Sequence, residues 1–194
     1  MFTAADFDIS KIELPPARKI NREGQARHLY NADLVKIFNE LPSDKWRCVF
    51  AIAYFTGARI SEVLKLRVED IHDGRINYVK ASTKKRKNRQ VKIVHQLQPF
   101  LDAYESPVEG YLFPAHHNTG RQGIATKPNA GHLSRPAADQ VLRRVTSQWD
   151  LDGTSTQSFR RSFATNLHLA GTPTAQIKRL LGHASIDQTA QYIG

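Results

Sequence analysis

The sequence predicts an α+β domain that is mainly α-helical and carries a small antiparallel sheet of three strands. From residue 31 to 66, and again from 135 to the end, apolar residues recur at steps of three and four, the period of helices that face a core. From Val68 the pattern changes to short strand-like runs around Asp73-Gly74, a pair typical of a hairpin turn. A chain of 194 residues can form one well-cored domain, and two full domains would be tight.

The first 30 residues show no sustained apolar period. They contain Pro15-Pro16 and scattered charges, which are typical of irregular chain. We therefore expect residues 1–30 to be an extended arm or linker remnant, and residues 31–194 to form the domain.

Three helices are expected next. Asn31 is a suitable N-cap, and Pro42 ends the first helix. Its apolar positions are Leu34, Ile37, Phe38 and Leu41. The second helix opens at Ser43, is apolar almost all round, and is closed by Gly57, so it should be the central buried helix. A short third helix covers residues 58–66.

The predicted sheet and the helix after it occupy the middle of the chain. The three strands lie within residues 68–71, 75–82 and 89–94. A helix is expected over 96–105, with Pro99 in its first turn, where a missing N–H is tolerated. Residues 114–131 are rich in Gly, Asn and His and should form a long surface loop.

The C-terminal part should again be helical. A helix over 135–151 would place Leu142, Val145 and Trp149 inward. A second helix follows from Thr156. The last two helices should begin at Thr172, with Pro173 at the first helical position, and at Ser185, with Gln188 completing a capping box.

The composition indicates a polyanion-binding protein that is neither secreted nor embedded in a membrane. Lys and Arg number 28 against 18 Asp and Glu, a formal charge of +10. No apolar run reaches the roughly 18 residues of a membrane span. The single cysteine, Cys48, lies in an apolar stretch and should be a small core residue. Charge alone leaves ribosomal, membrane-surface and DNA-binding functions open.

Arg59 and Glu62 are the first candidate functional pair. A helix places them about 60° apart, beside an apolar stripe. They could form a surface ion pair worth a few tenths of a kcal/mol. Alternatively, Glu62 could hold the guanidinium so that its planar fork meets two phosphate oxygens.

The basic run 83–89 links the second and third predicted strands. Its candidate DNA contacts are Lys85, Arg86, Lys87 and Arg89. One lysine held over a phosphate could also donate a proton to a leaving 5′-hydroxyl, because neighbouring cations lower the pKa of a lysine. Spacing alone does not choose among Lys84, Lys85 and Lys87.

Two adjacent arginines follow in the helix that begins near Thr156. On a helical wheel, Arg160 borders the apolar stripe and Arg161 points almost opposite to it. We therefore expect Arg160 to be half-buried and Arg161 to contact solvent or the DNA backbone. Gln157 lies about 60° from Arg160 and could share a ligand with it.

His183 and Tyr192 are the remaining candidates. His183 follows Gly182, which ends a helix, so its ring should project from a turn as a structural hydrogen-bond partner or a catalytic group. No second His or Cys stands nearby at metal-ligand spacing, and we predict no metal. Tyr192 lies on the final helix. A phenol with a pKa near 10 is ionised about one part in a thousand at pH 7, so it needs arginines or a base to act as a nucleophile.

Four separated boxes resemble the catalytic domain of the tyrosine recombinase, or phage integrase, family. They are TGARISEVLKLRVEDI, a lysine of the β-hairpin, SFRRSFATNLHLAG and LLGHASIDQTAQYIG, in the family's order. The resemblance covers about residues 31–194. It implies the tyrosine-recombinase catalytic-domain fold.

The resemblance also assigns roles. Arg59 and Arg160 match the two catalytic arginines, and Glu62 the acidic residue that supports the first. Lys84 matches the hairpin lysine, His183 the histidine of the LGH box, and Tyr192 the nucleophile. The family forms a 3′-phosphotyrosyl link to duplex DNA without a cofactor. Members act as assemblies on DNA, tetramers by the family's pattern, so we expect a DNA partner and an intracellular, cytoplasmic location; the chain alone could be monomeric.

Gln157 departs from the family pattern, which usually has a histidine or lysine there. An amide can hydrogen-bond a phosphate oxygen but cannot take the proton of a tyrosine. Many members also carry an N-terminal core-binding domain and a C-terminal tail, which these 194 residues do not include. Two alternatives therefore stand beside an active recombinase: a DNA-binding protein without turnover, and an enzyme like a type IB topoisomerase.

Overall fold

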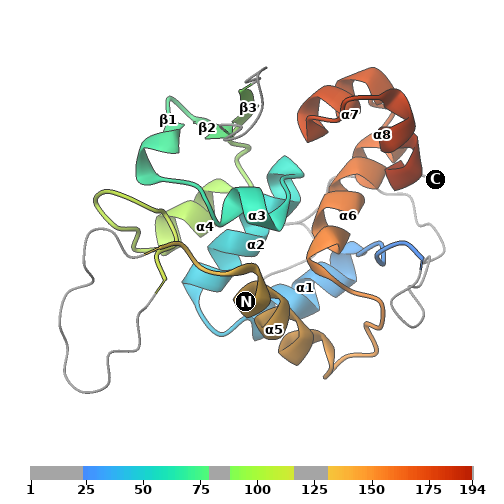
Figure 1. Ribbon diagram of the computed structural model, residues 1–194. Coiled ribbons are helices and arrows are strands. Elements are labelled where there is room, and N and C mark those ends of the chain that lie inside the picture. Colours follow the sequence, from blue (N-terminus) through green and yellow to red (C-terminus); the bar gives the residue numbers. More distant parts are fainter. Residues whose placement is uncertain (1–23, 79–87, 116–130, 194) are drawn as a thin grey trace.

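The computed structural model describes residues 24–78, 88–115 and 131–193 (Figure 1). The helices of the first half are α1 (Asn31–Glu40), α2 (Asp44–Thr56), α3 (Ile60–Val63) and α4 (Gln98–Ala103). Those of the second half are α5 (Arg135–Thr146), α6 (Thr156–Leu169), α7 (Thr174–Leu181) and α8 (Ile186–Ile193). The strands are β1 (Ile71–His72), β2 (Arg75–Tyr78) and β3 (Arg89–Lys92), and a 3₁₀ turn at Val68–Asp70 precedes β1. The predicted fold class, mainly helical with a three-stranded antiparallel sheet, is confirmed.

The sheet has the order β1-β2-β3, and both pairs are antiparallel. Asp73 and Gly74 have φ angles of 52° and 66°, the two successive positive values that a tight hairpin requires. Ile76 of β2 pairs with Val91 of β3, and both side chains are buried. Residues 79–87, which include Lys84, Lys85, Arg86 and Lys87, lie outside the described residues.

Helix α2 is the centre of the core, as its apolar composition predicts. Every residue from Cys48 to Thr56 is buried. The rings of Phe50 and Phe159 stack at 5.0 Å and join α2 to α6, and each such ring contributes about 1.5–3 kcal/mol when fully buried. Cys48 is the expected small core residue, and burial raises the pKa of its thiol to about 12.

A smaller cluster attaches α7 and α8 to the C-terminal half of α6. Its buried members are Phe163, Ala164, Ile177 and Leu181, and Leu167, Leu180, Tyr192 and Ile193 pack against them. Figure 1 shows the α7–α8 pair and the sheet at the same end of the molecule, with α3 between them. The C-terminal helices that carry the predicted nucleophile are therefore held by a small apolar cluster next to the main core.

The described part of the predicted N-terminal arm packs on the domain. Arg27, His28 and Leu29 are buried. The backbone N–H of Leu29 donates to Ser162 Oγ at 2.7 Å, and His28 Nε2 lies 2.9 Å from Asn166 Oδ1. The segment forms neither a helix nor a strand. Its apolar residues therefore have no regular spacing from which burial could be predicted. Packing against α6 therefore begins before Asn31.

Several predicted boundaries shift. Helix α5 ends at Thr146 and not at residue 151. Pro173 is the N-cap of α7, so the helix starts one residue later than expected. Ser185 Oγ accepts from the backbone N–H of Gln188 at 3.3 Å, but the Gln188 amide oxygen accepts from Ala184, so the capping box is only half formed. No helix within the described ranges is long and apolar enough to cross a membrane.

Candidate active site

The ends of α2, α3, α6, α7 and α8 meet at one site, and four of the five predicted catalytic residues lie there. These are Arg59, Arg160, His183 and Tyr192. The fifth, Lys84, falls outside the described residues, so its place at the site stays a prediction.

Arg59 and Glu62 form the predicted pair at the start of α3. The backbone N–H of Arg59 donates to Glu62 Oε2 at 2.7 Å, so the carboxylate caps the helix. Arg59 Nη1 lies 3.6 Å from Glu62 Oε1. The Arg59 side chain is 42% exposed, which leaves its guanidinium accessible to a ligand from solvent.

Glu62 also faces two further arginines. Its Oε2 lies 3.5 Å from Arg89 Nη2 and 3.9 Å from Arg160 Nη1. One carboxylate therefore lies close to three guanidinium groups, which balances part of their positive charge and limits their mutual repulsion.

Arg160 is fully buried, whereas the helical wheel predicts a half-buried side chain. Its Nη1 donates to the carbonyl of Gly57 at 2.7 Å, and its Nη2 to the carbonyl of Leu181 at 2.8 Å. The wheel considers α6 alone and misses α8, whose Tyr192 ring lies 5.7 Å from Arg160 Cζ. Burial lowers the pKa of Arg160, yet a guanidinium stays charged at neutral pH. Among the described residues, its Nε has no hydrogen-bond acceptor.

His183 is held by a threonine, Thr189, that was not among the residues predicted from the sequence. His183 Nδ1 lies 2.9 Å from Thr189 Oγ1, and both residues are buried. Thr189 lies three residues before Tyr192 and so on the same face of α8, a spacing by which it could have been found. Burial lowers the pKa of His183 to about 4, with the charge of Arg160 as the next cause, so the ring is neutral at pH 7.

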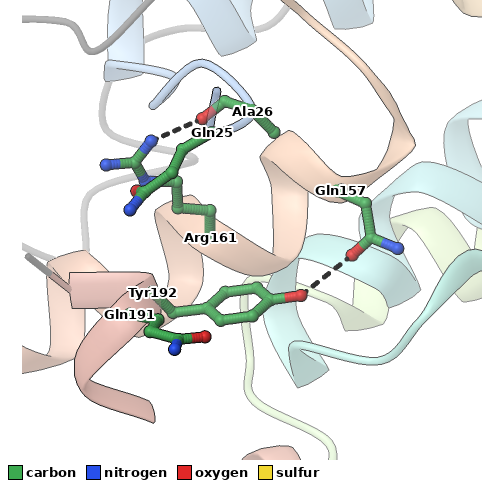
Figure 2. Close-up of a pocket in the computed structure, with 6 residues that line it drawn as sticks. All are labelled: Gln25, Ala26, Gln157, Arg161, Gln191 and Tyr192. Atoms are coloured by element: carbon green, nitrogen blue, oxygen red, sulfur yellow. Dashed lines mark hydrogen bonds between the residues drawn. The ribbon is translucent and has the colours of Figure 1, made fainter. Parts of the chain in front are cut away.

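Tyr192 points into the same site from α8. Its ring lies 5.2 Å from the His183 ring. Its hydroxyl donates to Gln157 Oε1 at 3.2 Å, as Figure 2 shows. Beside this bond is a pocket of about 270 Å³, lined by Gln25, Ala26, Gln157, Arg161, Gln191 and Tyr192. Gln157 therefore contacts the phenol directly and can orient its hydroxyl.

Arg161 is not a solvent-facing contact, contrary to the prediction. The residue is 7% exposed, and its Nη1 donates to the carbonyl of Ala26 at 2.7 Å (Figure 2). Its side of α6 is covered by the N-terminal segment. The covered side is a second packed face of α6. Its signal in the sequence is the pair of small residues Ser158 and Ser162, both of which are buried.

Arg89 is also inside the molecule, contrary to its prediction as a DNA contact. Its side chain is 11% exposed, and its Nη1 donates to the carbonyls of Leu180 and, at 3.4 Å, of Thr56. Arg89 is the last residue of the basic run in the sequence, but β3 begins at this residue and turns its side chain toward α7.

No cluster of three or more His, Cys, Asp or Glu side chains in the described ranges could hold a metal ion. The groups present at the site include a phenol, an imidazole, several guanidiniums and the Glu62 carboxylate that faces them. Such a set suits a phosphodiester, because guanidiniums bind its oxygens and a phenol can attack its phosphorus.

Comparison with known proteins agrees with the geometry. Residues 27–194 match the phage integrase family. The chain is 36% identical over 147 residues to tyrosine recombinase XerD of Mycobacterium tuberculosis, across 75% of this chain and 46% of the relative. It is 32% identical over 148 residues to tyrosine recombinase XerC of Rhodospirillum centenum, across 75% and 41%. The chain thus spans about half the length of the curated relatives that it matches.

Solved structures share the fold. The catalytic domain of bacteriophage HP1 integrase matches with a TM-score of 0.64 and 22% identity, over 87% of each chain. The XerA recombinase matches with a TM-score of 0.71 and 17% identity, over 90% of this chain and 62% of the other. At these identities the likeness concerns the fold alone.

Proposed function

Because the chain belongs to the phage integrase family and is homologous to tyrosine recombinases, we propose that it cleaves and rejoins duplex DNA through a 3′-phosphotyrosyl intermediate. One observation carries this proposal: the Tyr192 ring lies within 5.2 Å of the His183 ring and 5.7 Å of Arg160 Cζ. A nucleophile and two phosphate-binding groups thus face one position.

The substrate is duplex DNA. The recombinase XerH has been solved bound to its difH substrate, and a lambda integrase dimer has been solved on a core site. The formal charge of +10 suits the same class of polyanion. We expect the protein to act on DNA inside the cell, as part of an assembly.

In the cleavage step, Tyr192 Oη forms a bond to phosphorus and the bond from phosphorus to the 5′ oxygen breaks. The tyrosine loses its proton, and the leaving 5′ oxygen gains one, which by family resemblance comes from Lys84. The strand is rejoined when a 5′-hydroxyl attacks the phosphotyrosyl link, so the bond energy is conserved and no cofactor is needed.

Three groups would stabilise the negative charge that builds up on the non-bridging oxygens. Arg59 offers an accessible guanidinium, and Arg160 has an Nε without a hydrogen-bond partner within the described structure. Neutral His183 can donate from Nε2 when its Nδ1 accepts from Thr189. Arg160 and His183 are held by hydrogen bonds before the substrate arrives, so little reorganisation of these two donors is needed during the reaction.

Gln157 limits the ways in which the Tyr192 hydroxyl can lose its proton. Its amide oxygen accepts the hydroxyl proton in a hydrogen bond but has no basicity with which to remove it. The proton must then pass to water or to a phosphate oxygen. This contact also favours a second candidate function, a DNA-binding protein of the same fold that does not turn over.

A covalent-adduct assay separates the two functions. Wild-type protein is incubated with a nicked suicide duplex and analysed under denaturing conditions, with Tyr192→Phe as the matched control that lacks only the hydroxyl. We expect an adduct from the wild type and none from Tyr192→Phe. Equal amounts from both proteins would exclude catalysis by this tyrosine.

Gln157→His tests the second candidate. If the amide limits the reaction, a histidine should raise the adduct yield or rate, since general bases typically contribute about 10²–10⁴-fold. Duplex binding without adduct in either protein would favour the non-catalytic function.

A further inference from the structure

The C-terminal ends of α2 and α7 meet beneath the candidate site, and two arginines bind both of them. Arg160 donates to the carbonyls of Gly57 and Leu181. Arg89 donates to the carbonyls of Thr56 and Leu180, one residue earlier in each helix. The two guanidiniums thus bind successive carbonyls at both helix ends, where the helix dipoles favour cations.

Arg89 is fixed on its other sides as well. Its guanidinium carbon lies 4.3 Å from the centroid of the Tyr78 ring, and the Tyr78 hydroxyl hydrogen-bonds Thr56 Oγ1 at 2.8 Å. Glu62 Oε2 lies 3.5 Å from Arg89 Nη2. With 11% of its side chain exposed, little of the group is left to contact DNA.

Arg89 connects the sheet to the turn that carries His183. Its partner Leu180 is 91 residues away in the sequence. A Cβ added at Gly182 would lie 3.4 Å from Arg89 Cδ, so the arginine packs directly against the glycine that ends α7. The backbone N–H of His183 in turn donates to Lys178 within the same helix end.

We propose that Arg89 is a positioning residue that holds the last turn of α7 against the end of α2 and so places His183 and Arg160 for the reaction. The inference rests on the proposed function. Arg89 contacts the carbonyls and Glu62, not the substrate, and its planar fork is required because several acceptors must be bound at once.

The kinetic test compares Arg89→Gln and Arg89→Lys with Lys92→Gln, which removes one exposed positive charge from the same strand. Adduct formation is measured in a single turnover at saturating protein, and duplex affinity is measured separately. We expect both Arg89 variants to react about a hundredfold more slowly, as for a misplaced catalytic group, with duplex affinity close to that of the wild type. Lys92→Gln should react at the wild-type rate.

Two results would overturn the proposal. If Arg89→Lys reacts like the wild type, only charge is needed. If Arg89→Gln weakens duplex binding but reaches the wild-type rate at saturation, Arg89 is a DNA contact.

Amide hydrogen exchange supplies a readout that does not depend on catalysis. Exchange at Gly182 and His183 should accelerate about tenfold or more in Arg89→Gln relative to amides of α1, which report on stability elsewhere. Unchanged relative exchange would overturn the positioning role. If the wild type forms no adduct at all, the proposed function fails, and hydrogen exchange still decides the role of Arg89.

Discussion

At the scale of single residues, His183 links the charge of the site to the stability of the fold. Its pKa in the folded protein is about 4, below the ordinary value of 6.5. Between these values the unfolded chain binds a proton that the folded protein does not bind. The free energy of unfolding therefore falls as pH drops from about 6.5 toward 4, by at most about 1.4 kcal/mol per pH unit.

This predicts a pH-dependent difference between the wild type and His183→Gln, which cannot titrate at that position. The free energy of unfolding in urea is measured for both proteins at pH 7.5 and pH 5. The wild type should lose up to about 2 kcal/mol more than the variant over this interval. His168→Gln, at an exposed position of α6, is the control and should behave like the wild type. A difference that does not change with pH would contradict the prediction.

The helical pattern of α6 predicted which of the two arginines borders its apolar stripe, but it did not predict that both arginines are buried. The apolar stripe of α6 distinguishes Arg160 from Arg161, and Arg160 does lie at the site. Helical geometry alone does not reveal that the 24–30 segment covers Arg161, because that segment has no sequence period of its own. The position of Arg89 was missed for a similar reason, since its partners are carbonyls of distant helix ends.

At the scale of elements, the sharp end of α2 allows three helices to approach one another. Gly57 has a φ of 61°, and a Cβ there would lie 2.4 Å from Phe163 Cδ1 and 2.8 Å from Leu181 Cδ2. Phe163 belongs to α6 and Leu181 to α7. A side chain at Gly57 would therefore push apart α6, which carries Arg160, and α7, whose end leads into the turn with His183.

A comparison of Gly57→Ala with Gly74→Ala separates the cost of overpacking at Gly57 from the cost of backbone strain. Gly74 also has a positive φ, 66°, but a Cβ there would meet nothing within 4 Å. Gly74→Ala should lose only the cost of backbone strain, about 1 kcal/mol. Gly57→Ala should lose about 1–3 kcal/mol more through overpacking, measured as free energy of unfolding in urea. Equal losses would show that the close approach is unimportant.

The glycine stop signals were read correctly from the sequence, whereas the start signals at Asn31 and Thr172 were each displaced by one residue, because Tyr30 and Pro173 are the N-caps. Gly57 and Gly182 end α2 and α7 in left-handed conformations, as their positions predict. These signals are local, so neighbouring residues are sufficient to show them. The ends of α2 and α7 are brought together by tertiary packing, which no local signal shows. The four boxes could therefore be recognised from the sequence, but the arginine contacts between them could not.

At the scale of the whole molecule, the formal charge of +10 must act through side chains other than the buried arginines. Arg89, Arg160 and Arg161 are largely or fully enclosed and are bound to carbonyls. In the proposed function Arg160 would reach only the phosphate at the site, so the remaining phosphate contacts are left to exposed groups such as Arg59 and to the basic run, whose residues Lys85 and Arg86 remain predicted DNA contacts.

The salt dependence of duplex binding tests whether exposed side chains, and not the buried Arg161, make the phosphate contacts. With about six phosphate contacts, the association constant should fall roughly a thousandfold between 50 and 200 mM salt. Arg161→Gln should leave the slope of log K against log salt unchanged, because its guanidinium is bound to Ala26. The double variant Lys85→Gln with Arg86→Gln should make the slope shallower by about two contacts, roughly 1.8 units for B-form DNA. If Arg161→Gln alone produced a loss of one contact, the arginine would have to leave Ala26 and reach the phosphate backbone when DNA binds. An unchanged slope would show that Arg161 makes no phosphate contact in the complex.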